Sequence, residues 1–83
     1  GNITVAEFAL ALLLNVARKV TESYTDYKNG CVKPENLIGT ELCGKTVGIV
    51  GLGAIGSAFA KIAHGLSMNI LGFDKYEKEE LKQ

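Results

Sequence analysis

Three glycines stand at the spacing of a phosphate-binding turn. Gly51, Gly53 and Gly56 belong to the run Gly-Leu-Gly-Ala-Ile-Gly. In such a run the first glycine permits a sharp turn, the second lets a phosphate approach the backbone, and the third lets a helix pack close to a strand. The helix that follows offers free N–H groups and a partial positive charge to an anion. The expected donors are the amides of Ala54 and Ile55.

A carboxylate follows at the distance that a dinucleotide site requires. Asp74 ends the next apolar stretch, 18 positions after Gly56. A carboxylate there accepts hydrogen bonds from ribose hydroxyls and repels a 2′-phosphate, so the pattern favours NAD over NADP. The adjacent Lys75 argues weakly in the other direction, because a cation tolerates a phosphate. A P-loop is excluded, since no Gly-Lys-Ser/Thr follows the glycines, and a glycine turn without a ligand stays the alternative.

The elements around the glycines have the order of a βαβ unit. Thr46–Val50 is short and rich in β-branched residues, which predicts a buried parallel strand. A helix is expected from Ala54 to Leu66, and a second strand from Asn69 to Phe73. Residues at helical spacing form the predicted apolar face: Ile55, Ala58, Phe59, Ile62, Ala63 and Leu66. The opposite face holds Ser57, Lys61 and His64, so His64 is expected to be a solvated surface residue.

Before and after this unit the sequence is less regular. A helix is predicted from Thr4 through Val20, with Thr4 and Glu7 as a capping box. It is apolar on nearly every side, which indicates burial on more than one side. Residues 21–44 are polar and read as a long arm that packs on another chain or holds a short helix. The charged tail from 75 to 83 is expected to be a helix start or a frayed end.

Composition excludes several classes of function. Nine basic residues balance nine acidic ones in 83, so nothing attracts nucleic acid or an anionic membrane. The longest apolar run, Phe8–Leu14, is far below the ~20 residues of a membrane span, and no signal peptide is expected. Cys31 and Cys43 have no ligand-spaced partners, so the sequence predicts no metal site and reduced thiols in the cytoplasm. A Cys31–Cys43 bridge stays open as the minor alternative.

Two stretches together resemble a known family. Asn2–Glu7, with the leucine-rich helix after it, and Glu41–Gly53 are similar to the D-isomer-specific 2-hydroxyacid dehydrogenases, and the resemblance extends to about Tyr76. It implies an α/β fold that is a partial Rossmann domain. Residues 1–83 would be the N-terminal portion of a dinucleotide-binding domain, with a linking helix (1–20), an arm (21–44) and a βαβ unit (45–76).

The resemblance also implies a cofactor site and a partner. The NAD site would contain the three glycines of the turn, Ala54 and Ile55 at the pyrophosphate, and Asp74 at the adenosine ribose. Val5 would lie near the nicotinamide. A homodimer or higher oligomer would form through the Val5–Val20 helix and the Thr21–Gly44 arm.

The parent activity implied by the resemblance is hydride transfer between NAD and C2 of a D-2-hydroxyacid. The family's catalytic arginine, glutamate and histidine match none of these positions, and neither Arg18 nor His64 takes their place. The chain alone is therefore expected to lack catalytic residues and to be inactive. Two alternatives stay open, namely an NAD-sensing module like the corepressor branch of the family, and a self-assembling chain without ligand function.

Overall fold

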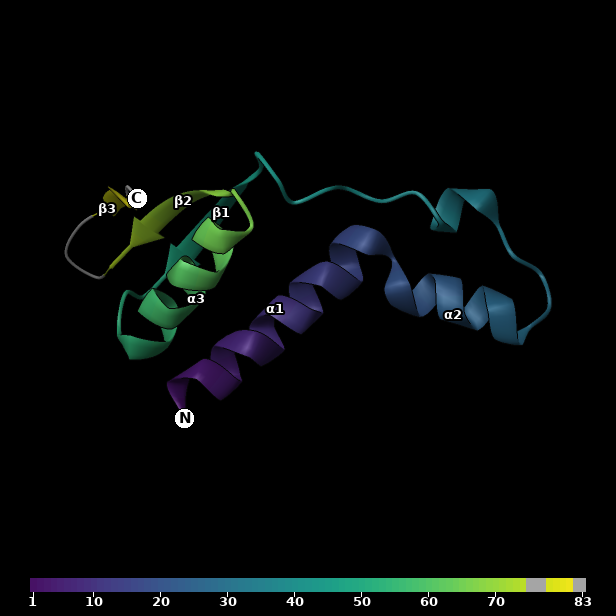
Figure 1. Cartoon of the computed structure of the whole chain (residues 1–83), viewed down its shortest axis with the longest axis horizontal. Helices are drawn as coiled ribbons and strands as arrows, with labels where there is room; N and C mark the ends of the chain where they lie inside the picture. Colours follow the sequence, from purple (N-terminus) through teal and green to yellow (C-terminus); the bar gives the residue numbers. More distant parts are fainter. Residues whose placement is uncertain (75–77, 82–83) are drawn as a thin grey trace.

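The computed structural model describes residues 1–74 and 78–81 and shows three helices, a short 3-10 helix and a small sheet (Figure 1). The elements are α1 (Asn2–Arg18), α2 (Val20–Lys28), the 3-10 helix Pro34–Asn36, β1 (Thr46–Val50), α3 (Ala54–Gly65), β2 (Asn69–Phe73) and β3 (Lys78–Leu81).

The predicted βαβ unit is confirmed, but β1 is not the buried strand that was expected, since Ile49 is its single buried residue and Val50 is 89% exposed. β1 and β2 pair in parallel, with Thr46 opposite Asn69 and Val50 opposite Phe73. α3 connects them and packs on one face of the sheet. The core between helix and sheet consists of Ile49, Ala60, Ala63, Met68 and Ile70. Ser57, Lys61 and His64 are exposed, as the helical spacing predicts. Ile55 was expected on the apolar face but stays 45% exposed, because it lies in the first turn at the mouth of the site.

The tail forms a strand, so the expectation of a helix start or frayed end is wrong for residues 78–81. β3 pairs antiparallel with β2, Lys78 opposite Phe73 and Leu81 opposite Ile70, which makes the sheet three-stranded. An edge strand exposes unpaired N–H and C=O groups. β3 pairs with those groups on β2. The stabilisation comes from backbone hydrogen bonds and does not depend on a hydrophobic pattern in β3.

The start of α1 differs from the prediction. The helix begins at Asn2 with Gly1 as its N-cap, and no side chain caps it. Thr4 therefore lies inside the first turn, and the predicted Thr4–Glu7 capping box does not form. The N–H of Val5 donates to the carbonyl of Gly1 at 3.3 Å, so the backbone closes this turn by itself.

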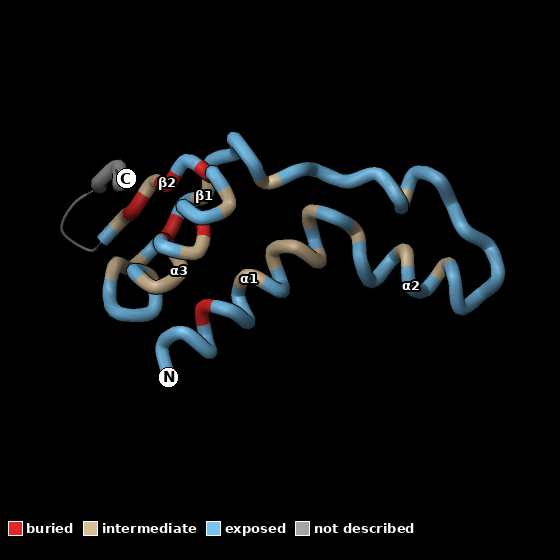
Figure 2. Tube along the Cα trace, in the orientation of Figure 1, coloured by how far each residue is buried: buried red, intermediate tan, exposed pale blue. Residues whose placement is uncertain are grey.

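α1 is covered on one side only. It packs against α3, and Ala6 is its single buried residue among those that the structure describes. Burial on more than one side, as the apolar composition predicted, is therefore not achieved within this chain. Leu10, Leu13 and Leu14 are half-buried, whereas Phe8, Leu12 and Val16 are exposed, and most of the helix is open to solvent (Figure 2).

α1 ends two residues before the predicted end, and part of the predicted arm is helical. Lys19 adopts a left-handed conformation with φ 56°, and α2 begins at the next residue. The Asn15 side-chain oxygen accepts hydrogen bonds from Thr21 N at 2.8 Å and from Thr21 Oγ1 at 2.9 Å. Asn15 thus caps α2 from the preceding helix, an interaction that the capping rules for a single helix do not predict.

The arm projects from the rest of the chain. α2 and the segment after it are exposed almost throughout (Figure 2). The radius of gyration is 15.2 Å, against about 12 Å for a compact chain of this length. Hydrogen bonds inside the arm nevertheless hold it together. Asn36 Nδ2 donates to Asp26 Oδ2 at 2.9 Å, and Ser23 Oγ donates to the carbonyl of Asn36.

Cys31 and Cys43 are free thiols on exposed residues, so the alternative of a bridge between them is not observed. Within residues 1–74 and 78–81, none of the helices combines the length and the apolar content that crossing a bilayer requires.

Candidate functional site

The glycine turn between β1 and α3 has the geometry that its sequence predicts at two positions. Gly51 has φ +93°, a conformation that residues with a side chain rarely adopt. A Cβ on Gly56 would overlap the carbonyl oxygen of Gly51 and would lie 3.3 Å from Ile49 Cγ2. The turn and its close packing on the strand therefore explain Gly51 and Gly56 without any ligand.

Gly53 has no such explanation within the protein. Its φ of −70° suits any residue. A Cβ built there would meet no atom of the described residues within 4 Å. Gly65, at the other end of α3, is equally free of strain and neighbours, so the argument depends on the place of Gly53 in the turn before the helix, where a ligand can approach the backbone.

The N-terminus of α3 presents hydrogen-bond donors beside Gly53. Gly53 is the N-cap and supplies no side-chain acceptor. The first backbone bond of the helix runs from Ser57 N to the carbonyl of Gly53 at 2.8 Å. Helix geometry leaves the N–H groups of Ala54, Ile55 and Gly56 without an intrahelical acceptor, and the helix dipole adds partial positive charge there. This end of α3 is therefore suited to bind an anion.

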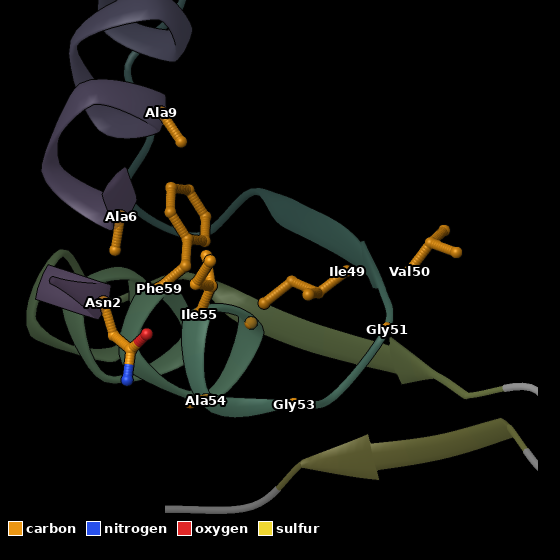
Figure 3. A pocket seen from close by; sticks show the side chains of 11 residues that line it. Asn2, Ala6, Ala9, Ile49, Val50, Gly51, Gly53, Ala54, Ile55 and Phe59 are labelled. Atoms are coloured by element: carbon orange, nitrogen blue, oxygen red, sulfur yellow. The ribbon is translucent and has the colours of Figure 1, made fainter. Parts of the chain in front are cut away.

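A groove of about 510 Å³ opens beside the turn, which is within the usual range for ligand sites. Its walls come from α1, from the end of β1 and from the start of α3 (Figure 3). The lining residues are Asn2, Ala6, Ala9, Ile49, Val50, Gly51, Gly53, Ala54, Ile55, Gly56 and Phe59.

Sequence reasoning missed the α1 wall of this groove. Ala9 projects from α1 toward Phe59 on α3, and Ala6 and Asn2 lie below it along the same wall (Figure 3). Alanines three residues apart share one side of a helix. That spacing is the signal that would have indicated a close helix–helix approach at this point.

Two predicted site residues lie outside the lining. Val5 is 48% exposed, and the groove is lined instead by its neighbour Ala6. Asp74 is exposed and directly follows β2. The N–H of Gly51 donates to the carbonyl of Phe73 at 2.6 Å, which joins the glycine turn to the residue before Asp74. The contacts of Val5 and Asp74 with a cofactor stay predictions.

A metal site would require a cluster of ligand side chains among the described residues. Those residues hold no group of three or more His, Cys, Asp or Glu side chains that could bind a metal ion. His64 is exposed on α3, opposite the helix's buried side. The chemistry of the site is therefore the binding of an anion by backbone N–H groups.

Comparison with known families and sequences agrees with this geometry. Residues 10–83 match the model of the D-isomer-specific 2-hydroxyacid dehydrogenase NAD-binding domain. A 2-hydroxyacid dehydrogenase A of Aspergillus oryzae is 43% identical over 79 residues, which are 95% of this chain and 23% of that protein. A D-3-phosphoglycerate dehydrogenase of Archaeoglobus fulgidus is 41% identical over 81 residues, 96% of this chain and 15% of that protein.

Solved structures give the same result. The D-lactate dehydrogenase of Escherichia coli without ligand superposes with a TM-score of 0.82 at 33% identity, covering 92% of this chain and 24% of that one. A pyruvate reductase of Chlamydomonas reinhardtii gives 0.84 at 35% identity, covering 90% and 22%. The chain thus spans about a quarter or less of the length of these relatives.

Proposed function

Because this chain belongs to the D-isomer-specific 2-hydroxyacid dehydrogenase family, through its NAD-binding domain, we propose that it forms the pyrophosphate and adenosine part of the cofactor site of a D-2-hydroxyacid dehydrogenase. NAD is the cofactor of this domain. The single observation that carries the proposal is the open space at Gly53, which no described protein atom fills and which lies at the N-terminus of α3 beside its free N–H groups.

Each part of the site has a distinct role in this proposal. The N–H groups of Ala54 and Ile55 bind the pyrophosphate, and the Gly51 turn holds them at the end of β1. Asp74 accepts hydrogen bonds from the adenosine ribose, and Val5 lies toward the nicotinamide. When bound, NAD exchanges a hydride with C2 of the substrate. The protein's part in such chemistry is to position the cofactor.

The relatives favour an enzyme over a sensing module. Those compared above are named as dehydrogenases or reductases, and others include a D-lactate dehydrogenase and a glyoxylate reductase. We therefore place the chain in the dehydrogenase branch rather than the corepressor branch. The inactivity of the 83 residues alone and a cytoplasmic location stay predictions.

Titration of the chain with NAD and with NADP tests the cofactor site. We expect amide NMR shifts at Gly53, Ala54, Ile55 and Asp74, with a dissociation constant for NAD on the order of 1 mM, and weaker shifts with NADP. Asp74→Asn removes the negative charge at nearly constant shape. It should weaken NAD binding about threefold to tenfold and should bring the NADP affinity up to that of NAD.

A control variant tests whether the preference for NAD over NADP depends on Asp74 in particular. Glu41→Asn removes a carboxylate of the segment before β1, outside the groove, and should leave both affinities unchanged. If Asp74→Asn and the unchanged chain prefer NAD equally, Asp74 does not select the cofactor. If millimolar NAD shifts no residue of the turn, the proposed site does not function in this chain.

We further propose that the chain forms a homodimer through α1 and the arm. Phe8, Leu12 and Val16 lie four residues apart on one side of α1 and are 65%, 51% and 77% exposed. Apolar side chains at this spacing form a continuous stripe, and a contiguous exposed apolar patch favours association. The arm, Thr21–Gly44, follows α1 beyond the Val16 end of that stripe.

A charge in the stripe should separate the subunits. Val16→Glu places a carboxylate at a largely exposed position, so the fold of the single chain should tolerate it. We expect sedimentation equilibrium to show a dimer for the unchanged chain and a monomer for Val16→Glu. His64→Glu, at an exposed position on α3, should stay dimeric. A monomeric unchanged chain at high micromolar concentration would refute the dimer.

A further inference from the structure

One side chain holds the glycine turn from the helix side. Ser57 lies in the first turn of α3, and its Oγ donates a hydrogen bond to the carbonyl of Leu52 at 3.1 Å. Ser57 is exposed and contributes nothing to the core. Serine is a poor residue for a helix interior because its hydroxyl competes for backbone groups. Here that tendency is directed at the phosphate-binding turn.

The hydrogen bond fixes the orientation of one peptide group. In a trans peptide the C=O and the following N–H point in opposite directions, and the chain contains no cis peptide among its described residues. Since the carbonyl of Leu52 faces Ser57, the N–H of Gly53 points away from α3. Gly53 itself is exposed and lines the groove.

The neighbouring peptide groups have the same arrangement. The carbonyl of Gly51 packs on Gly56, so the N–H of Leu52 points outward. The carbonyl of Gly53 accepts from Ser57 N at 2.8 Å, so the N–H of Ala54 also points outward. Close packing fixes the first peptide and the helix fixes the third. The middle peptide, which joins Leu52 to Gly53, is held by the Ser57 hydroxyl.

We propose that Ser57 is a positioning residue that presets the N–H of Gly53 as an additional donor to the pyrophosphate, beside Ala54 and Ile55. The proposal rests on the proposed cofactor site and adds the residue that organises it. Without the hydroxyl, the Leu52–Gly53 peptide is free to rotate, because glycine restricts its neighbours little. Binding would then have to order that peptide, which lowers affinity.

The test compares Ser57→Ala, which removes the hydroxyl, with Ser57→Thr, which keeps it. Each chain is titrated with NAD and, separately, with adenosine, which has no phosphate. We expect Ser57→Ala to weaken NAD binding about threefold to tenfold, the effect of losing one well-placed hydrogen bond. Ser57→Thr should stay within about twofold of the unchanged chain, and adenosine binding should be the same in all three.

A measurement without ligand examines the hydrogen bond itself. The carbonyl ¹³C resonance of Leu52 should move upfield in Ser57→Ala and stay in place in Ser57→Thr. Equal NAD affinities of Ser57→Ala and the unchanged chain would overturn the proposal, as would an equal loss of adenosine binding. If the unchanged chain binds no NAD, the proposed function is wrong. If the Leu52 resonance is the same in all three chains, the hydrogen bond from Ser57 does not form, and the inference about Ser57 is wrong.

Discussion

The Gly56→Ala variant is expected to be destabilised by about 3 kcal/mol, near the upper end of the range for overpacking. The added methyl group would overlap the carbonyl oxygen of Gly51 and press on Ile49. Backbone cannot rotate away as a flexible side chain can, so α3 would have to move off the sheet. A chain of this length has a total stability of about 4–12 kcal/mol, and the loss is a large part of it.

Urea denaturation followed by circular dichroism measures this effect. Gly65→Ala is the matched control, since it adds the same methyl group at the other end of α3, where a Cβ meets no described atom within 4 Å. That change should leave stability unchanged or raise it by up to about 1 kcal/mol through helix propensity. Equal midpoints for the two variants would show that α3 does not approach the turn as closely as described.

The part of the fold that sequence predicted is the part governed by local rules. The run Thr46–Val50 and the glycines after it specify a strand, a turn and a helix in successive residues, and each confirms the next. The second strand, Asn69–Phe73, follows from the same alternation of elements. Gly51 and Gly56 were predictable because the sharp turn and the close packing of helix on strand require glycine at these two positions.

What sequence did not predict depends on which residues come into contact, whether they are near in sequence or far apart. α1 ends at Lys19 although lysine favours helix, and Asn15 of α1 fixes the start of α2. β3 forms because β2 has an edge to satisfy, whatever the charge of the strand that pairs with it. The α1 wall of the groove, at Ala6 and Ala9, exists only because α1 packs on α3.

The Gly53→Ala variant should separate ligand binding from folding. It makes the same chemical change as Gly56→Ala, three residues earlier in the same turn. Its φ of −70° accepts alanine, and the new methyl group meets no described protein atom. Stability should therefore change by less than about 1 kcal/mol, a small loss at the N-cap being offset by reduced freedom of the unfolded chain.

Binding should respond in the opposite way. If the pyrophosphate lies against the backbone at Gly53, the methyl group occupies its place, and the affinity for NAD should fall by at least about tenfold, or 1.4 kcal/mol. NAD titration by NMR and urea denaturation on the same sample measure both quantities. Unchanged NAD affinity in Gly53→Ala would mean that no phosphate approaches this glycine. A folded chain without NAD binding would assign Gly53 to the cofactor, just as a destabilised Gly56→Ala would assign Gly56 to the fold.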